Sequence, residues 1–215
     1  MGAIARSAAN NITTSGVFTS TAIANSSVTG ITVLANASDG ITFISSQTAS
    51  NSASLSFTSG LDSTYKAYKF VFSSIHPRTD GVEFQFNMST DAGSNYNVTK
   101  TSSFFYSGHN ESGTTTYLEY NVTQDLAQST AFQTIAHEVG NDADQSCSGS
   151  MILFNPASTT YVKHFIANTN IGQINNYTYN AYSAGYGNTT SAVDAIQFKI
   201  SSGNFDGTIY LYGIK

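Results

Sequence analysis

The sequence predicts an all-β protein, specifically an antiparallel two-sheet sandwich of jelly-roll type with an extended N-terminal arm. From about residue 40 onward, apolar and polar residues alternate with a period of two, which is typical of half-buried strands. Only 10% of the residues are charged, and Ser, Thr and Asn supply most of the polarity, which favours strands over surface helices. Roughly ten to twelve short strands with almost no helix between them exclude parallel βαβ units. We expect two parts, an arm or stalk over residues 1–40 and a β-sandwich head domain over residues 41–215.

Residues 1–40 differ in composition from the rest of the chain. They contain no Tyr and one Phe, and isolated Ile and Val residues alternate with turn-forming Asn, Ser, Thr and Gly. One copy of such a segment cannot enclose its own apolar side chains, whereas several copies around an axis can. We therefore expect docking or oligomerisation through this arm, with a homotrimer as the predicted assembly; a dimer, single arms on a capsid lattice and a flexible tail are the alternatives. The expected contact residues are Val17, Phe18, Ile23, Val28 and Ile31.

Residues 146–167 predict the hairpin around which the domain is built. Residues 151–154 are an unbroken apolar run, residues 161–167 are rich in aromatic and β-branched side chains, and Asn-Pro-Ala-Ser-Thr between them supplies turn chemistry. Pro156 ends the first strand because it fixes φ and donates no hydrogen bond. Cys147, at the start of that strand, is expected in the core and not as a reactive thiol.

Further strands follow from the same alternation. Asp-Ser, Asp-Gly and Asp-Ala-Gly provide turns between the early strands, and residues 125–128 are expected to form one helical turn. The last strand is expected to close a sheet. The predicted strands are residues 41–48, 53–58, 65–73, 82–89, 99–107, 117–122, 131–139, 177–186, 192–200 and 208–214.

Composition excludes several classes of function. The formal charge is −5, and no Lys or Arg lies between Lys100 and Lys163, so the chain is not expected to bind nucleic acid, which needs clustered cations. No apolar run approaches membrane-spanning length, and the first residues lack the continuous hydrophobic region of a secretory signal. A single cysteine excludes an internal disulfide and a cysteine zinc site.

No motif predicts an enzyme. The four histidines do not lie at metal-ligand spacing, and His137-Glu138 is only half of a zinc-protease motif because Asn141 stands where the second histidine would be. No Gly-x-Ser-x-Gly elbow is present. No cofactor is expected, apart from calcium at Asp142 and Asp144, for which a solvated turn is the alternative.

A tyrosine-rich segment is the predicted ligand surface. Between residues 175 and 188, tyrosine rings alternate with Asn, Ser, Thr and Gly, and such rings stack on sugars while amides donate and accept hydrogen bonds. The alternative is that alternate tyrosines face the core. The residues concerned are Tyr177, Tyr179, Tyr182 and Tyr186.

Several segments resemble structural proteins of tailed bacteriophages that infect marine bacteria and cyanobacteria. They are Leu-Asp-Ser-Thr-Tyr (61–65), Ile-His-Pro-Arg-Thr-Asp-Gly (75–81), Ser-Asn-Tyr-Asn-Val-Thr (94–99), Ala-Asp-Gln-Ser-Cys-Ser-Gly (143–149) and Asn-Pro-Ala-Ser-Thr-Thr-Tyr-Val-Lys-His-Phe (155–165). The resemblance covers roughly residues 55–215, and residues 16–30 are similar to the stalk starts of phage fibre proteins.

The resemblance implies a non-enzymatic virion protein with a β-rich head, as a tail fibre, a head fibre or a capsid decoration. Its expected partners are other virion proteins (capsid, portal or tail) and a host-surface glycan used in host attachment. The alternatives are a tailspike-type enzyme acting on host-surface glycans and a sugar-binding lectin of non-viral origin.

Overall fold

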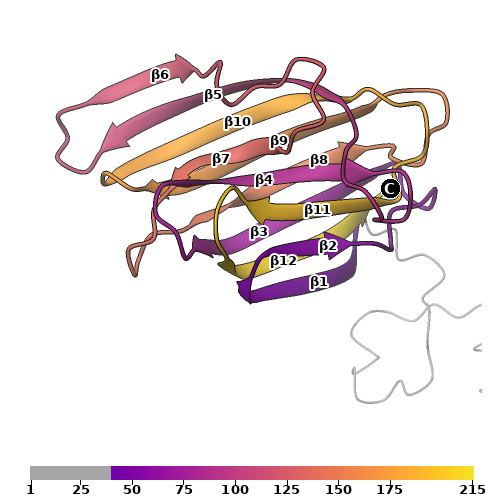
Figure 1. Cartoon of the computed structure of the whole chain (residues 1–215), viewed down its shortest axis with the longest axis horizontal. Helices are drawn as coiled ribbons and strands as arrows, with labels where there is room; N and C mark the ends of the chain where they lie inside the picture. The colour runs from indigo at the N-terminus through magenta and orange to yellow at the C-terminus, as the bar shows by residue number, and fades with distance from the viewer. Residues whose placement is uncertain (1–39) are drawn as a thin grey trace, which may run out of the picture. The chain divides into compact units, whose positions relative to one another are not determined.

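The computed structural model describes residues 40–215, which form an antiparallel all-β domain of twelve strands with no helix in that part of the chain (Figure 1). The described part therefore also holds no helix long and apolar enough to cross a membrane. The strands are β1 (Ile41–Ser52), β2 (Ser54–Phe57), β3 (Ala67–Pro77), β4 (Val82–Ser89), β5 (Lys100–Asn110), β6 (Thr116–Tyr120), β7 (Gln133–Val139), β8 (Cys147–Phe154), β9 (Lys163–Gln173), β10 (Tyr177–Gly187), β11 (Ala195–Ile200) and β12 (Phe205–Ile214).

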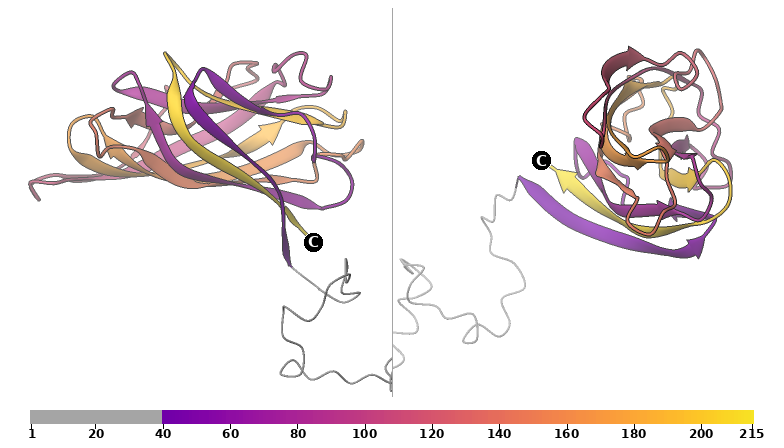
Figure 2. Two further views of the ribbon diagram at one scale, coloured as in Figure 1. Left: turned by 90° about the horizontal axis from the view of Figure 1, so that it is seen from below. Right: turned by 90° about the vertical axis from the view of Figure 1, so that its left-hand side faces the viewer.

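Hydrogen bonds join all twelve strands into one sheet that folds over itself and nearly closes (Figure 2). We call the run β1-β12-β3-β8-β9-β10-β5-β6 the long layer and the run β7-β4-β11-β2 the short layer. The two layers are joined where Val139 of β7 pairs with Gln173 of β9. The outer face is the surface of the long layer that points away from the short layer.

Aromatic side chains fill the space between the layers. Phe198 of β11 lies at the centre, with its ring centroid 5.2 Å from that of Phe70 and 5.3 Å from that of Phe72 on the opposite layer. Phe86 of β4 meets Phe165 of β9 edge to face at 4.9 Å. Rings on both layers are buried because each strand alternates, which places every second residue in this core.

The predicted central hairpin is confirmed. Strands β8 and β9 pair antiparallel, with Leu153 opposite Phe165, and they lie in the interior of the long layer. Strand β8 ends immediately before Asn155, whose φ of 46° turns the chain ahead of Pro156. Cys147 is buried, as expected.

Two local predictions are wrong. Residues 125–128 form no helical turn; the chain bends at residues 127 and 128, where Gln128 has a φ of 50°, and then Ser129 pairs with Lys100 in an isolated antiparallel bridge. The last strand, β12, does not close the sheet, because it lies between β1 and β3 and leaves β1 at the edge. The two-sheet jelly roll stays a prediction, since the hydrogen-bonded sheet is continuous. Residues 1–39, with the expected contact residues Val17, Phe18, Ile23, Val28 and Ile31, lie outside the described residues.

Candidate functional site

The outer face of β9, β10, β5 and β6 collects the polar and aromatic side chains that the core does not use. In β9 every even-numbered residue from His164 to Asn170 is exposed, while the odd-numbered residues between them are buried. Register then places Tyr182 of β10 between Asn168 of β9 and Phe105 of β5. Residues from four consecutive strands of the layer therefore share one continuous surface.

An aromatic ridge crosses this surface. Phe105 and Tyr182 are each 40% exposed and stack with their ring centroids 5.0 Å apart and their planes 12° from parallel. On the next strand, Tyr120 lies opposite Phe105 and is also exposed. Leu118, two residues before Tyr120 on the same face, is 74% exposed. These side chains leave apolar area in solvent that is available for a ligand.

An amide ladder lies beside the ridge. Asn168 donates to the side-chain oxygen of Asn180 at 3.0 Å, and Asn180 donates to the hydroxyl oxygen of Tyr182 at 2.7 Å. Asn170 donates to the hydroxyl of Thr178 at 2.9 Å. These bonds hold the amides in fixed rotamers. The Oδ1 atoms of Asn168 and Asn170 accept no hydrogen bond within residues 40–215, so acceptors remain for a ligand hydroxyl.

Two hollows lie at the two ends of the ladder. One of about 380 Å³ is lined by Ser107, His109, Asn170, Thr178 and Asn180, among others. The other, of about 440 Å³, is more apolar, and its lining includes Phe154, His164, Ile166, Ala184 and Tyr186. Both hollows are open to solvent. Along β10, Tyr182 lies between them. The surface therefore suits an extended ligand better than a small enclosed one.

The structure divides the four tyrosines of the predicted ligand surface. Tyr182 and Tyr186 lie on the outer face, and Tyr186 packs against His164 at 6.0 Å. Tyr177 and Tyr179 lie on the inner face, where the ring of Tyr179 is buried 4.9 Å from that of Tyr106. The alternation along β10 thus sends each pair to a different side, so one pair is available to a ligand and the other packs inside.

Phe105, Leu118 and Tyr120 were not expected at a site. The signal that could have found Phe105 is the run Phe104-Phe105-Tyr106, because three successive aromatics in a strand cannot all face the core. Phe104 and Tyr106 are buried and Phe105 is exposed. For Leu118 and Tyr120 the strand pattern alone leaves the exposed face undetermined.

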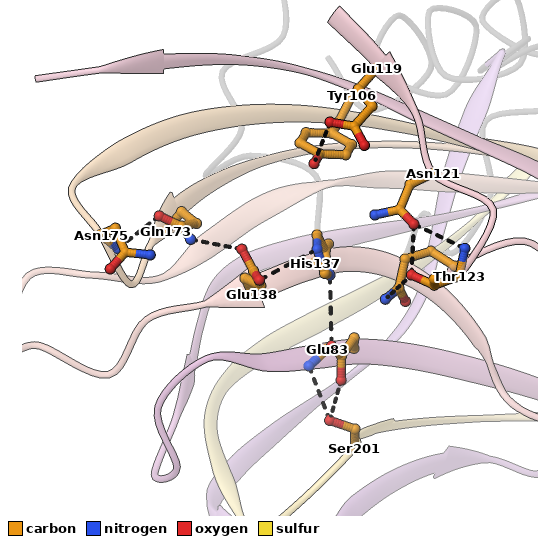
Figure 3. Close-up of polar contacts among 11 residues, drawn as sticks. Glu83, Tyr106, Glu119, Asn121, Thr123, His137, Glu138, Gln173, Asn175 and Ser201 are labelled. Carbon is orange, nitrogen blue, oxygen red and sulfur yellow. Dashed lines mark hydrogen bonds and ion pairs between the residues drawn. The ribbon is translucent and has the colours of Figure 1, made fainter. Parts of the chain in front are cut away.

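A second polar group surrounds His137 on the inner side (Figure 3). Its Nδ1 atom lies 3.6 Å from Glu83 Oε1, and its Nε2 atom lies 3.7 Å from Glu138 Oε1. Ser201 donates to the other oxygen of Glu83 at 2.6 Å, and Gln173 donates to the other oxygen of Glu138 at 2.8 Å. The contact with His137 is the main cause that holds the pKa of Glu83 below its usual value. In each carboxylate one oxygen is hydrogen-bonded and the other lies within 3.7 Å of the imidazole, while the buried Nδ1 atom of His137 has no hydrogen-bond partner among residues 40–215.

The two carboxylates considered for calcium lie on an exposed turn. Gln145 closes this turn: its backbone N–H donates to the carbonyl of Asp142 at 2.9 Å, and its side-chain Oε1 accepts from the backbone N–H of Asp142 at 3.2 Å. Asp144 is exposed on the same turn. Within residues 40–215, no three His, Cys, Asp or Glu side chains gather as a group that could hold a metal ion. The calcium prediction therefore depends on these two exposed carboxylates alone.

Comparison with known proteins identifies no relative. No protein-family model, no curated protein and no solved structure matches the chain.

Proposed function

We propose that the chain is a non-enzymatic virion protein of a tailed phage, fibre-like or capsid-decorating, whose arm docks on the particle and whose β domain projects outward. Two sequence observations support this role: the resemblance over residues 55–215, and the change of composition near residue 40. For the fold, the proposal keeps the jelly-roll type, which is supported by the two layers packed face to face around Phe198.

The observation that carries the adsorption role is the aromatic ridge beside the amide ladder on the outer face. Aromatic rings such as those of Phe105 and Tyr182 can contact the C–H face of a sugar ring. The ladder supplies fixed amide groups for sugar hydroxyls, and it contains no ionised side chain. The ligand that fits this chemistry is an uncharged glycan of the host surface, bound lengthwise between the two hollows.

The proposal is tested by binding of the full chain to an array of bacterial surface glycans. We expect binding to neutral glycans that Phe105→Ala and Tyr182→Ala each weaken about fivefold or more, since stacking on an aromatic face is worth on the order of 1 kcal/mol. Phe43→Ala is the matched control, because Phe43 is also an exposed phenylalanine packed against one tyrosine, on the distant strand β1. Absence of glycan binding, or equal loss in the control, contradicts the adsorption role.

The same aromatic and amide groups on the outer face would equally suit a sugar-binding lectin of non-viral origin. The array result is the same for both, so the gene context separates them. A virion protein is expected beside genes for portal, capsid or tail proteins, and a lectin of non-viral origin is not.

A further inference from the structure

Two lysines are buried in the core of the domain. Lys100 of β5 and Lys163 of β9 both lie opposite Gly187 of β10, one on either side, and both have no exposed surface. Within the described residues, neither forms an ion pair with a carboxylate. A fully buried ammonium without a counter-charge is rare because its desolvation is costly.

The two ammonium groups have different neighbours. Lys163 donates only to backbone carbonyls, those of Ser158 and Tyr161 at 2.7 Å each and that of Thr189 at 3.3 Å. Lys100 donates to the carbonyl of Val98 at 2.8 Å and to the side-chain oxygen of Asn87 at 2.5 Å. Only Lys100 therefore faces a carboxamide, a group that can exchange its nitrogen.

Asn87, on β4, is itself buried, and both polar atoms of its side chain form hydrogen bonds. Its Oδ1 atom accepts from the backbone N–H of Met88 at 2.8 Å as well as from Lys100. Its Nδ2 atom donates to the carbonyl of Thr130 at 2.9 Å. When Lys100 attacks Cγ, the backbone N–H of Met88 remains as the donor that would stabilise negative charge on Oδ1.

Lys100 is equally fixed, and its amine is suited to attack. Its backbone exchanges two hydrogen bonds with Ser129, at 2.8 and 3.0 Å. Burial lowers the pKa of Lys100 to about 7, so near neutral pH much of it is the nucleophilic free amine. An amine held against a polarised carboxamide gains the large effective concentration of an intramolecular reaction.

We propose that Lys100 and Asn87 join in an intramolecular isopeptide bond. The Nζ lone pair attacks Cγ, the Nζ–Cγ bond forms and the Cγ–Nδ2 bond breaks. One Nζ proton passes to Nδ2, which leaves as ammonia, so no oxidant, reductant or other reactant is needed. No carboxylate within residues 40–215 contacts the pair, so the proton passes between the two nitrogens and the bond forms slowly after folding.

The product removes the buried charge and ties together β4 and β5, which are not hydrogen-bonded neighbours in the sheet. The retained oxygen still accepts from Met88. The bond would thus join the short layer to the long layer between two strands that share no hydrogen-bonded ladder. It would make the domain more resistant to unfolding.

Mass spectrometry of the purified full chain, denatured after prolonged incubation at mildly alkaline pH, tests the proposal. We expect a mass lower than that of the uncrosslinked chain by one ammonia. Between Arg78 and Lys163 the chain has only one tryptic site, Lys100, and trypsin does not cleave after an acylated lysine. Trypsin should therefore release residues 79–163 as one peptide lacking one ammonia, in place of residues 79–100 and 101–163.

Variants place the bond. Lys100→Met and Asn87→Ala should each restore the mass calculated without loss of ammonia, while Lys163→Met, which changes the other buried lysine, should keep the loss. The wild-type result decides the proposal even if a variant fails to fold. Free cleavage after Lys100, an unreduced mass, or loss of ammonia mapped to another peptide overturns it.

Discussion

Replacing Phe198 by alanine should destabilise the domain more than any exposed substitution, because this ring joins the two layers. Its centroid lies within 6.3 Å of those of five other phenylalanines, which come from both layers. Phe198 itself has no exposed surface. Truncation of such a ring removes its transfer energy and leaves a cavity, a loss of about 3–5 kcal/mol. Phe198→Leu, which keeps most of the volume, should cost about 1.5 kcal/mol or less.

The assay is urea unfolding of the full chain at one fixed protein concentration, followed by far-ultraviolet circular dichroism and tyrosine fluorescence, since the chain contains no Trp. The control is Phe43→Ala, which removes a ring that is 55% exposed and whose one aromatic neighbour within residues 40–215 is Tyr212, with ring centroids 5.6 Å apart. This change should cost about 1 kcal/mol or less. A loss for Phe198→Ala no larger than that of the control would refute the reasoning about the core.

Three further changes test other parts of the structure. Hydrogen bonds from Asn95 and Ser89 lower the pKa of Asp91 from 3.8 to about 2, so its stabilisation is present above pH 3.8 and lost as the pH falls through about 2. Asp91→Asn should flatten the fall of the melting temperature across that window, and parallel curves would contradict this. Burial raises the pKa of the Cys147 thiol to about 12, so a thiol reagent should label it only after unfolding, whereas full labelling of the native chain would count against its burial. Removal of residues 1–40 should convert the expected trimer to monomers in sedimentation velocity, and a full-length monomer or a trimer that survives the truncation overturns the role of the arm.

The sequence predicts strands well where local chemistry decides. In the β8–β9 hairpin, Asn-Pro stops one strand and the apolar runs define both, so the element could be predicted without knowing its partners. The neighbours of β12 could not, because β1 and β3 lie more than a hundred residues earlier in the chain and no local signal names them. The prediction of a closing strand failed for that reason.

The candidate site could be predicted only in part. Period-two alternation shows that Tyr179 and Tyr182 face opposite sides, but the sequence does not say which side is the core. Lys100 was not expected in the interior, because burial of lysine contradicts the usual rule and its compensation comes from Asn87, on another strand. Contacts of this kind join strands that are distant in the sequence, so no local pattern predicts them.

The most direct test of the proposed virion role is the composition of purified phage particles from the culture that carries this gene. Peptides of this chain should be found in the particles by mass spectrometry, and gold-labelled antibodies against the β domain should bind the particle surface. Antibodies should also block adsorption if the outer face meets the host. Particles that contain no peptide of this chain would contradict the proposed function.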